Sequence, residues 1–148
     1  PVHGLAVPHA GRLARERDSL RVVDDQRGAP TPARMIADIT ASVLAQWMEH
    51  AESGDESLGT YHLCAAGECT WYEFAQAVFA AAHAAGLIER EMQVVPIATA
   101  DYPTKARRPA YSVLDTTRIR NAFGLDLPQW QQGLDAVIAE LASLRSGV

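Results

Sequence analysis

Two proline-containing runs carry the residues best suited to bind a polar ligand. The first run, residues 24–31, has the sequence DDQRGAPT, and the second, residues 102–109, has the sequence YPTKARRP. Each follows a segment typical of a β-strand. Because proline stiffens the backbone and the polar side chains can bind an anion or a polyol, the two runs predict two walls of one ligand site.

The first run predicts a rigid corner between a strand and a helix. Gln26 offers both a donor and an acceptor, which suits sugar hydroxyl groups. Gly28 permits a positive φ, and Pro30 with Thr31 leads into a helix whose free amides attract polar groups. The alternative is a strand-to-helix turn that is stabilised by its own caps. From these residues alone the alternative is the stronger interpretation.

The second run places two arginines between prolines. The planar guanidinium of Arg107 or Arg108 can hold phosphate oxygens in a bidentate manner, and the prolines reduce the entropy lost when the loop is fixed. Tyr102 can pack on a base or a sugar. The alternative is an exposed basic loop, which an isolated arginine pair would favour.

The spacing of apolar residues predicts alternating strands and helices, and therefore an α/β fold. Threonine and proline at 31–32 are typical of a helix start, and Thr70 with Glu73 has the spacing of a capping box. Asp115 can cap a short helix that ends before Gly124. The expected strands are 20–23, 60–64 and 92–97. The expected helices are 32–51, 71–85 and 116–123, and a last helix that Pro128 opens and that bears apolar residues as far as Leu141.

The composition of the 148-residue chain is that of one globular domain, with 48% hydrophobic and 21% charged residues. A net charge of -5 argues against broad nucleic-acid binding. No apolar run approaches the roughly 20 residues of a membrane helix, and no signal pattern opens the chain, so we expect a cytoplasmic protein without membrane contact. Basic residues gather at 12–34, at 105–108 and at 118–120, which suits a phosphorylated ligand if the first two groups meet.

The cysteines and histidines do not have the paired spacing of a structural metal site. Cys64 and Cys69 are separated by four residues, and the histidines are scattered. We expect the two cysteines to be reduced and no metal to bind to this set.

The two runs and four further strings occur in the same order as in the RmlD-type dTDP-4-dehydrorhamnose reductases, a branch of the extended short-chain dehydrogenase/reductases. Together they resemble the carboxyl-terminal part of that family. The resemblance covers about residues 11–145. It implies a Rossmann-like α/β fragment with three short strands and about four to five helices, a substrate-binding lobe at 11–148 after an irregular start at 1–10, and an absent amino-terminal dinucleotide-binding half. The additional matching strings are 59–63 (GTYHL), 67–71 (GECTW), 112–116 (SVLDT) and 127–133 (LPQWQQG).

The resemblance also implies a reaction and its ligands. Family members use NADPH or NADH to reduce dTDP-4-dehydro-β-L-rhamnose to dTDP-L-rhamnose, which is used in lipopolysaccharide and other cell-surface polysaccharides. The implied substrate-binding residues are Gln26, Gly28, Pro30, Thr31, Tyr102, Arg107 and Arg108. Some relatives are thought to hold a divalent ion such as Mg between subunits through carboxylates. Arg34 occupies a position where relatives can carry glutamate, so no metal is expected here.

The catalytic half of the family pattern is missing from these residues. Hydride transfer in this superfamily needs a tyrosine and, four residues later, a lysine that lowers the tyrosine pKa. Lys105 is the only lysine, and the residue four before it is Asp101. No strand runs into the closely spaced glycines of a dinucleotide site. We therefore expect this chain alone to bind no cofactor and to reduce nothing.

Three classes of function remain open. The favoured one is the dTDP-sugar-binding part of a reductase, completed by an amino-terminal Rossmann half as partner. The second is a non-catalytic binding or regulatory subunit on the same scaffold, as the RmlD-like subunit of methionine adenosyltransferase is. The third is a plain α/β module whose helices, such as 32–51, serve only for association, for example in a homodimer. The full open reading frame would distinguish the first two, and size-exclusion behaviour that is independent of nucleotide would favour the third.

Overall fold

The computed structural model describes residues 12, 14, 16–50, 59–102, 106 and 108–146. The expected irregular start at 1–10 and the candidate residue Arg107 lie outside these ranges. In chain order, the elements are β1 (Ser19–Val23), β2 (Arg27–Gly28), α2 (Ala33–His50), β3 (Cys69–Thr70), α3 (Trp71–Ala84), β4 (Gln93–Ile97), the 3₁₀ turn η2 (Thr99–Asp101), α4 (Thr117–Phe123) and α5 (Trp130–Ser146).

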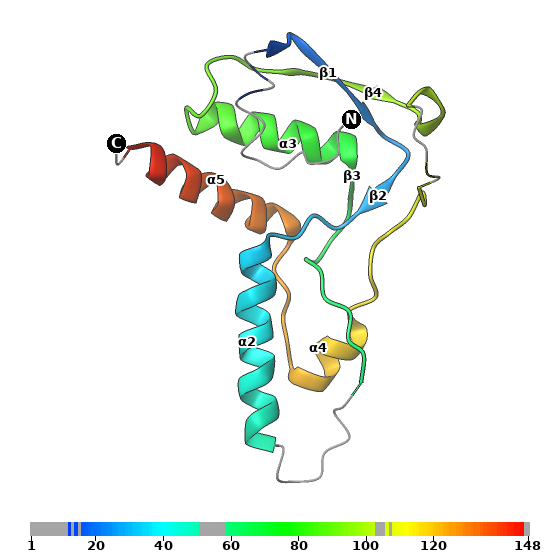
Figure 1. Ribbon diagram of the computed structural model, residues 1–148, viewed down its shortest axis with the longest axis vertical. Coiled ribbons are helices and arrows are strands. Elements are labelled where there is room, and N and C mark those ends of the chain that lie inside the picture. Colours follow the sequence, from blue (N-terminus) through cyan, green and yellow to red (C-terminus); the bar gives the residue numbers. More distant parts are fainter. Residues whose placement is uncertain are drawn as a thin grey trace.

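Two small sheets organise the chain. β1 and β4 pair in parallel, with Ser19 opposite Gln93 and Val23 opposite Ile97. β2 and β3 pair in antiparallel fashion over two residues each. Figure 1 shows α3 lying against the β1–β4 pair, with α5 on the other side of α3. The strands expected at 20–23 and 92–97 and the α/β character are thus confirmed.

The core lies around α3. Its Ala75, Val78 and Phe79 are at most 1% exposed, and they meet buried side chains of the β1–β4 pair and of α5. Each large apolar side chain that is fully buried contributes roughly 1.5–3 kcal/mol. The core therefore fixes the position of the first turn of α3, where the second sheet begins.

Local signals set both ends of α3. The Thr70 hydroxyl accepts a hydrogen bond of 3.1 Å from the Glu73 amide, and the Glu73 carboxylate accepts one of 2.7 Å from the Thr70 amide. This reciprocal pair confirms the expected capping box. After the helix, Gly86 adopts a φ of 68°, a left-handed conformation that favours glycine.

The strand expected at 60–64 is wrong: these residues are extended but pair with no strand in the described part of the chain. They contact α4 instead. The Tyr61 ring meets Phe123 edge-on at 5.3 Å, and the Arg118 guanidinium lies 4.8 Å from the Tyr61 ring centre. Arg118 also donates a hydrogen bond of 3.2 Å to the carbonyl of Thr60. A strand needs a neighbouring strand that pairs with its backbone groups. Here the carbonyl of Thr60 is bonded by the Arg118 side chain instead.

α2 projects away from the core (Figure 1) and exposes an apolar stripe. Ile36 is 41% exposed, Leu44 52%, Trp47 37% and Met48 69%. Their spacing places all four on one side of the helix, as the sequence predicts. We call this set the α2 apolar face. None of the described helices is long and apolar enough to cross a membrane.

Candidate functional site

The first predicted run pairs through Arg27 with the segment that follows the second run. The Arg27 amide donates a hydrogen bond of 2.8 Å to the carbonyl of Ala110, and the Ser112 amide donates one of 3.0 Å to the carbonyl of Arg27. The backbone of Arg27 therefore forms a parallel bridge with Tyr111. The Ser112 hydroxyl also donates to the Arg27 carbonyl at 3.0 Å. The first run is thus held against the segment that directly follows the second.

The start of the second run is tied to the same place. The Thr99 amide donates to both carboxylate oxygens of Asp25 at 3.0 Å, and the Thr99 hydroxyl donates to the same carboxylate. Because Asp25 and Arg27 are separated only by Gln26, Thr99 and Ser112 are bonded to the same corner of the first run. Positions 103–105 and 107, between Thr99 and Ser112, lie outside the described residues.

Gln26 stabilises this corner through its buried side chain and its backbone carbonyl. Its side chain is 7% exposed, and its Nε2 donates a hydrogen bond of 2.9 Å to the Thr99 hydroxyl. Its backbone carbonyl accepts a hydrogen bond of 3.3 Å from the Trp71 amide at the start of α3. From the sequence we expect this side chain to bind a sugar, whereas in the structure one of its N–H groups bonds to Thr99, just before the second run. Its contact with a ligand stays a prediction.

The same tether lowers the pKa of Asp25. The hydrogen bond from the Thr99 hydroxyl is the largest cause, and the bond from the Thr99 amide comes next. Both bonds stabilise the charged carboxylate. Asp25 therefore acts as an anchor for the second run.

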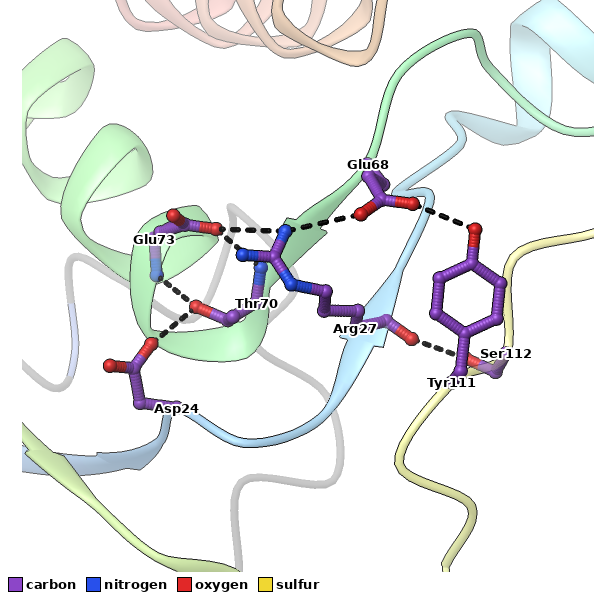
Figure 2. Close-up of polar contacts among 7 residues, drawn as sticks. All are labelled: Asp24, Arg27, Glu68, Thr70, Glu73, Tyr111 and Ser112. Carbon is purple, nitrogen blue, oxygen red and sulfur yellow. Dashed lines mark hydrogen bonds and ion pairs between the residues drawn. The ribbon is translucent and has the colours of Figure 1, made fainter.

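A polar network surrounds the side chain of Arg27 (Figure 2). Its Nη1 lies 3.3 Å from a Glu68 oxygen and 3.9 Å from a Glu73 oxygen. The Tyr111 hydroxyl donates a hydrogen bond of 2.7 Å to the other Glu68 oxygen, and this bond raises the pKa of Tyr111. We call Arg27, Glu68, Glu73 and Tyr111 the Arg27 network.

The first basic group is less available to a phosphate than the sequence suggests, because two of its arginines form ion pairs. Within the first basic group, Arg27 is balanced by two carboxylates, and Arg34 lies 3.8 Å from Asp38. A guanidinium that is already paired offers less attraction to a phosphate. Arg108 of the second group is exposed. Phosphate binding by either basic group stays a prediction.

Gly28 and Thr31 lie at the corner for reasons that differ from those expected. Gly28 is not among the glycines with positive φ. It instead permits a close approach, because an added Cβ would lie 3.3 Å from the Ser112 hydroxyl. The Thr31 hydroxyl donates to the carbonyl of Ala29 at 2.9 Å and accepts from the Ala65 amide at 3.0 Å. It connects the corner to the segment before β3 rather than capping α2.

A cavity of about 170 Å³ opens beside these residues. It is lined by 28–30, by Cys69, Thr70 and Trp71, and by Ser112. Two of the predicted site residues, Gly28 and Pro30, therefore share a cavity with side chains of α3 and of the segment after the second run.

Trp71 and Ser112 are not among the site residues that the sequence predicts. Trp71 is 42% exposed and lies at the edge of the core. Both residues occur in strings that match the reductase pattern. This match is the sequence signal that could have assigned both residues to the site. Helical spacing alone does not show that the Trp71 side of the first turn of α3 borders a cavity.

The remaining site residues lie on the second run. Tyr102 is half-buried directly after η2, and Arg108 is exposed. The backbone bonds of Thr99 and Ala110 bring the two ends of this run to the first run. Whether the side chains of Tyr102 and Arg108 contact a ligand stays a prediction.

The two cysteines are free and buried. Burial is the main cause that raises the pKa of Cys69 to about 11, and the neighbouring carboxylate of Glu73 adds to it. A thiol with such a pKa is protonated at neutral pH and is a poor nucleophile. Within the described ranges, no three His, Cys, Asp or Glu residues are grouped so that they could hold a metal ion.

Comparison with known proteins identifies similar chains. Residues 6–143 match the family model described as the RmlD substrate binding domain. The chain is 42% identical to the dTDP-4-dehydrorhamnose reductase of Burkholderia thailandensis over 134 residues, covering 89% of this chain and 45% of that protein. It is also 42% identical to the Escherichia coli K12 reductase, covering 88% of this chain and 42% of that protein.

A solved structure shows the same relationship. The Bacillus anthracis dTDP-4-dehydrorhamnose reductase, crystallised in complex with NADP, superimposes with a TM-score of 0.76 at 28% identity, covering 95% of this chain and 44% of that one. The chain therefore spans less than half the length of these relatives.

Proposed function

Because the chain belongs to the family of RmlD substrate-binding domains, we propose that it forms the substrate-binding part of a dTDP-4-dehydrorhamnose reductase. The proposed reaction reduces the C4 ketone of dTDP-4-dehydro-β-L-rhamnose to the hydroxyl of dTDP-L-rhamnose. A hydride comes from NADPH and a proton from an acidic side chain, so that the C=O bond becomes an HC–OH group. The work of this chain is to hold and orient the nucleotide sugar.

The observation that supports the proposal is that the first run is bonded to the residues on both sides of the second run. Residues 25–27 bond to Thr99 before it and to Ala110 and Ser112 after it. We propose that groups suited to hydroxyls and groups suited to phosphate, from positions about 80 residues apart, meet at this corner. Such convergence is typical of a binding site, because a loop that connected two elements would need no such tethers.

Within this site, we assign the diphosphate to Arg108. Arg108 is an exposed arginine within the part of the second run that resembles the reductase pattern. A guanidinium can bind two phosphate oxygens at once. Gln26 and Thr31 position the ligand mainly by fixing the backbone around the corner.

The chemical step requires residues that this sequence does not contain. A tyrosine followed four residues later by a lysine, and a glycine-rich turn for the dinucleotide, are both absent from the 148 residues. We therefore assign NADPH binding and proton donation to an amino-terminal domain joined to this one. The α2 apolar face supports this arrangement, because a large exposed apolar patch is typical of a surface that another domain or subunit covers.

The proposal is tested by titrating dTDP-rhamnose into the chain when it is joined to, or mixed with, an amino-terminal reductase half. We expect binding, together with NADPH-dependent reduction of the 4-keto sugar. Binding without reduction would favour the non-catalytic subunit, and the absence of binding would contradict both assignments.

Arg108→Ala tests the placement of the diphosphate. Loss of a hydrogen-bonded charge costs about 1.5–3 kcal/mol, so affinity should fall about 10- to 100-fold. Arg120→Ala is the control, because Arg120 is an exposed arginine on α4, outside both runs. Equal affinities for the two variants would show that the diphosphate lies elsewhere.

A further inference from the structure

We propose that the cavity beside Trp71 holds one uncharged ring of the bound nucleotide sugar, with the indole packed against that ring. This inference rests on the proposed function and adds the location of the uncharged part of the ligand. It assigns Trp71 as a substrate-binding residue and Ser112 as part of the cavity wall.

The size of the cavity limits what can occupy it. Its volume of about 170 Å³ suits a single substituted six-membered ring. Pockets for whole drug-sized ligands are larger, roughly 300–1,000 Å³. A complete nucleotide sugar therefore cannot lie inside, and only one end of it enters.

Trp71 is held so that part of its indole stays available. The indole meets Phe74 edge-on at 6.4 Å, and Phe74 meets Trp130 edge-on at 6.0 Å. Trp130 is a core residue, with only 7% of its surface exposed. This row of aromatic contacts fixes the indole from the core side, whereas 42% of the Trp71 surface remains exposed beside the cavity.

Electrostatics exclude the phosphates from this place. The Glu68 and Glu73 carboxylates lie on either side of Arg27, and the Asp24 carboxylate accepts a hydrogen bond of 2.7 Å from the Thr70 hydroxyl (Figure 2). Two carboxylates thus pair with one guanidinium, and a third is bonded to Thr70, which lines the cavity. Negative groups of the ligand are repelled, and an uncharged ring is not.

Gly28 keeps the cavity open. A Cβ at this position would lie 3.3 Å from the Ser112 hydroxyl, and both residues line the cavity. A larger side chain there would fill space that the ring requires. Glycine at position 28 therefore leaves room for the ligand and also allows the close backbone pairing with the segment at Ser112.

Two rings of the proposed ligand share the required chemistry. The thymine base and the deoxyhexose both have a six-membered ring, a methyl group and hydrogen-bonding groups at the edge. Stacking of a base on an aromatic side chain changes affinity by roughly 5- to 100-fold. Trp71→Ala should therefore produce a loss in that range for any ligand that carries the bound ring.

The experiment measures the affinities of dTDP-rhamnose, dTDP and pyrophosphate by calorimetry with the 148-residue chain, alone and mixed with the amino-terminal half. If the base occupies the cavity, Trp71→Ala weakens dTDP and dTDP-rhamnose equally. If the sugar occupies it, only dTDP-rhamnose is weakened. Pyrophosphate binding should be unchanged, and a loss for pyrophosphate as large as for dTDP-rhamnose would overturn the inference.

Control variants separate the ring contact from folding. Trp47→Ala removes a similarly exposed indole from α2, outside the cavity. Because the α2 apolar face is assigned to the amino-terminal domain, this control is measured with the 148-residue chain alone, where all affinities should stay unchanged. Trp71→Phe should retain most of the affinity, whereas Trp71→Leu, which keeps apolar volume for folding, should lose it. Full affinity in Trp71→Leu would overturn the inference.

The same titrations distinguish the inference from the proposed function. If Arg108→Ala weakens dTDP-rhamnose and Trp71→Ala does not, the inference fails and the proposed function stands. If the unmodified chain binds no dTDP-sugar in either form, the proposed function fails and the inference fails with it.

Discussion

The side chain of Gln26 donates a hydrogen bond of 2.9 Å to the hydroxyl of Thr99, 73 residues further along the chain. The Thr99 hydroxyl in turn donates to the carboxylate of Asp25. These bonds fix the start of the second run, and the backbone bonds of Arg27 fix its end. Residues on both sides of the second run are therefore anchored to three consecutive residues of the first run, 25–27.

Replacing Gln26 by alanine should destabilise the fold. The change removes a mostly buried hydrogen bond to Thr99, and we expect the free energy of unfolding to fall by about 1–3 kcal/mol in a urea titration. Gln76→Ala is the control, because Gln76 is exposed on α3, and its effect should stay within about 0.5 kcal/mol. Unchanged stability with weaker dTDP-sugar binding would instead place the role of Gln26 at the ligand.

Thr99→Val should raise the pKa of Asp25 toward its ordinary value of 3.8. The variant loses the hydroxyl bond, which is the largest cause of the lowered pKa, and keeps the amide bond. NMR titration of the Asp25 carboxyl group measures the change directly. The pKa of Asp115, which is lowered by its own bonds to Thr117, is the internal control and should not move.

The same variant gives a signed prediction for stability against pH. A carboxyl group whose pKa is lowered in the folded state stabilises the fold above its unfolded pKa, and this contribution is lost as the pH falls through the folded pKa. The difference in unfolding free energy between the native chain and Thr99→Val should therefore be larger at about pH 6 than at acid pH below the lowered pKa of Asp25, where only the part due to the lost Gln26 bond remains. A difference that is constant across this window would show that Asp25 does not respond to Thr99.

Thr70→Ala should cost about 1–2 kcal/mol of unfolding free energy. The hydroxyl caps α3 through the Glu73 amide and also donates to Asp24, so two bonds are lost. Thr116→Ala is a matched control, since Thr116 precedes α4 without a capping bond from its side chain. Equal losses in the two variants would contradict the role assigned to the capping box.

Gly133→Ala should destabilise the chain although alanine is the better helix former. An added Cβ on α5 would lie 2.9 Å from ring atoms of Pro32, which precedes α2. Overpacking of this kind costs about 1–3 kcal/mol, whereas an unhindered change from glycine to alanine in a helix gains up to about 1 kcal/mol. The sign of the change in thermal or urea unfolding therefore decides whether the contact is tight.

The double variant Pro32→Ala/Gly133→Ala checks the cause. Removing the ring atoms opens space for the new Cβ, so the double variant should be more stable than the sum of the two single changes predicts. Strict additivity would mean that Pro32 does not resist the added methyl group.

The sequence by itself determined the helices and the family. Capping residues, glycines after helices and apolar spacing act within a few residues, so they are readable without a fold. Thr70 with Glu73 starts α3, and Gly124, with a φ of 59°, ends α4, as expected. The order of short strings likewise identified the reductase family, which the matched family model confirms.

Only the tertiary structure decided what depends on distant neighbours. The two-residue strands β2 and β3 exist because Arg27–Gly28 meets Cys69–Thr70, and no local pattern announces such a pair. The segment 60–64 has the composition of a strand but lacks a partner in the described chain, so it is not one.

The candidate site shows the same division. The sequence determined which residue types stand in the two runs. The fold decided that Gln26 is buried against Thr99, that Arg27 is balanced by Glu68 and Glu73, and that Trp71 borders a cavity. Burial, charge pairing and open space each depend on residues at least 40 positions apart, and their energies arise only once the chain has brought them together.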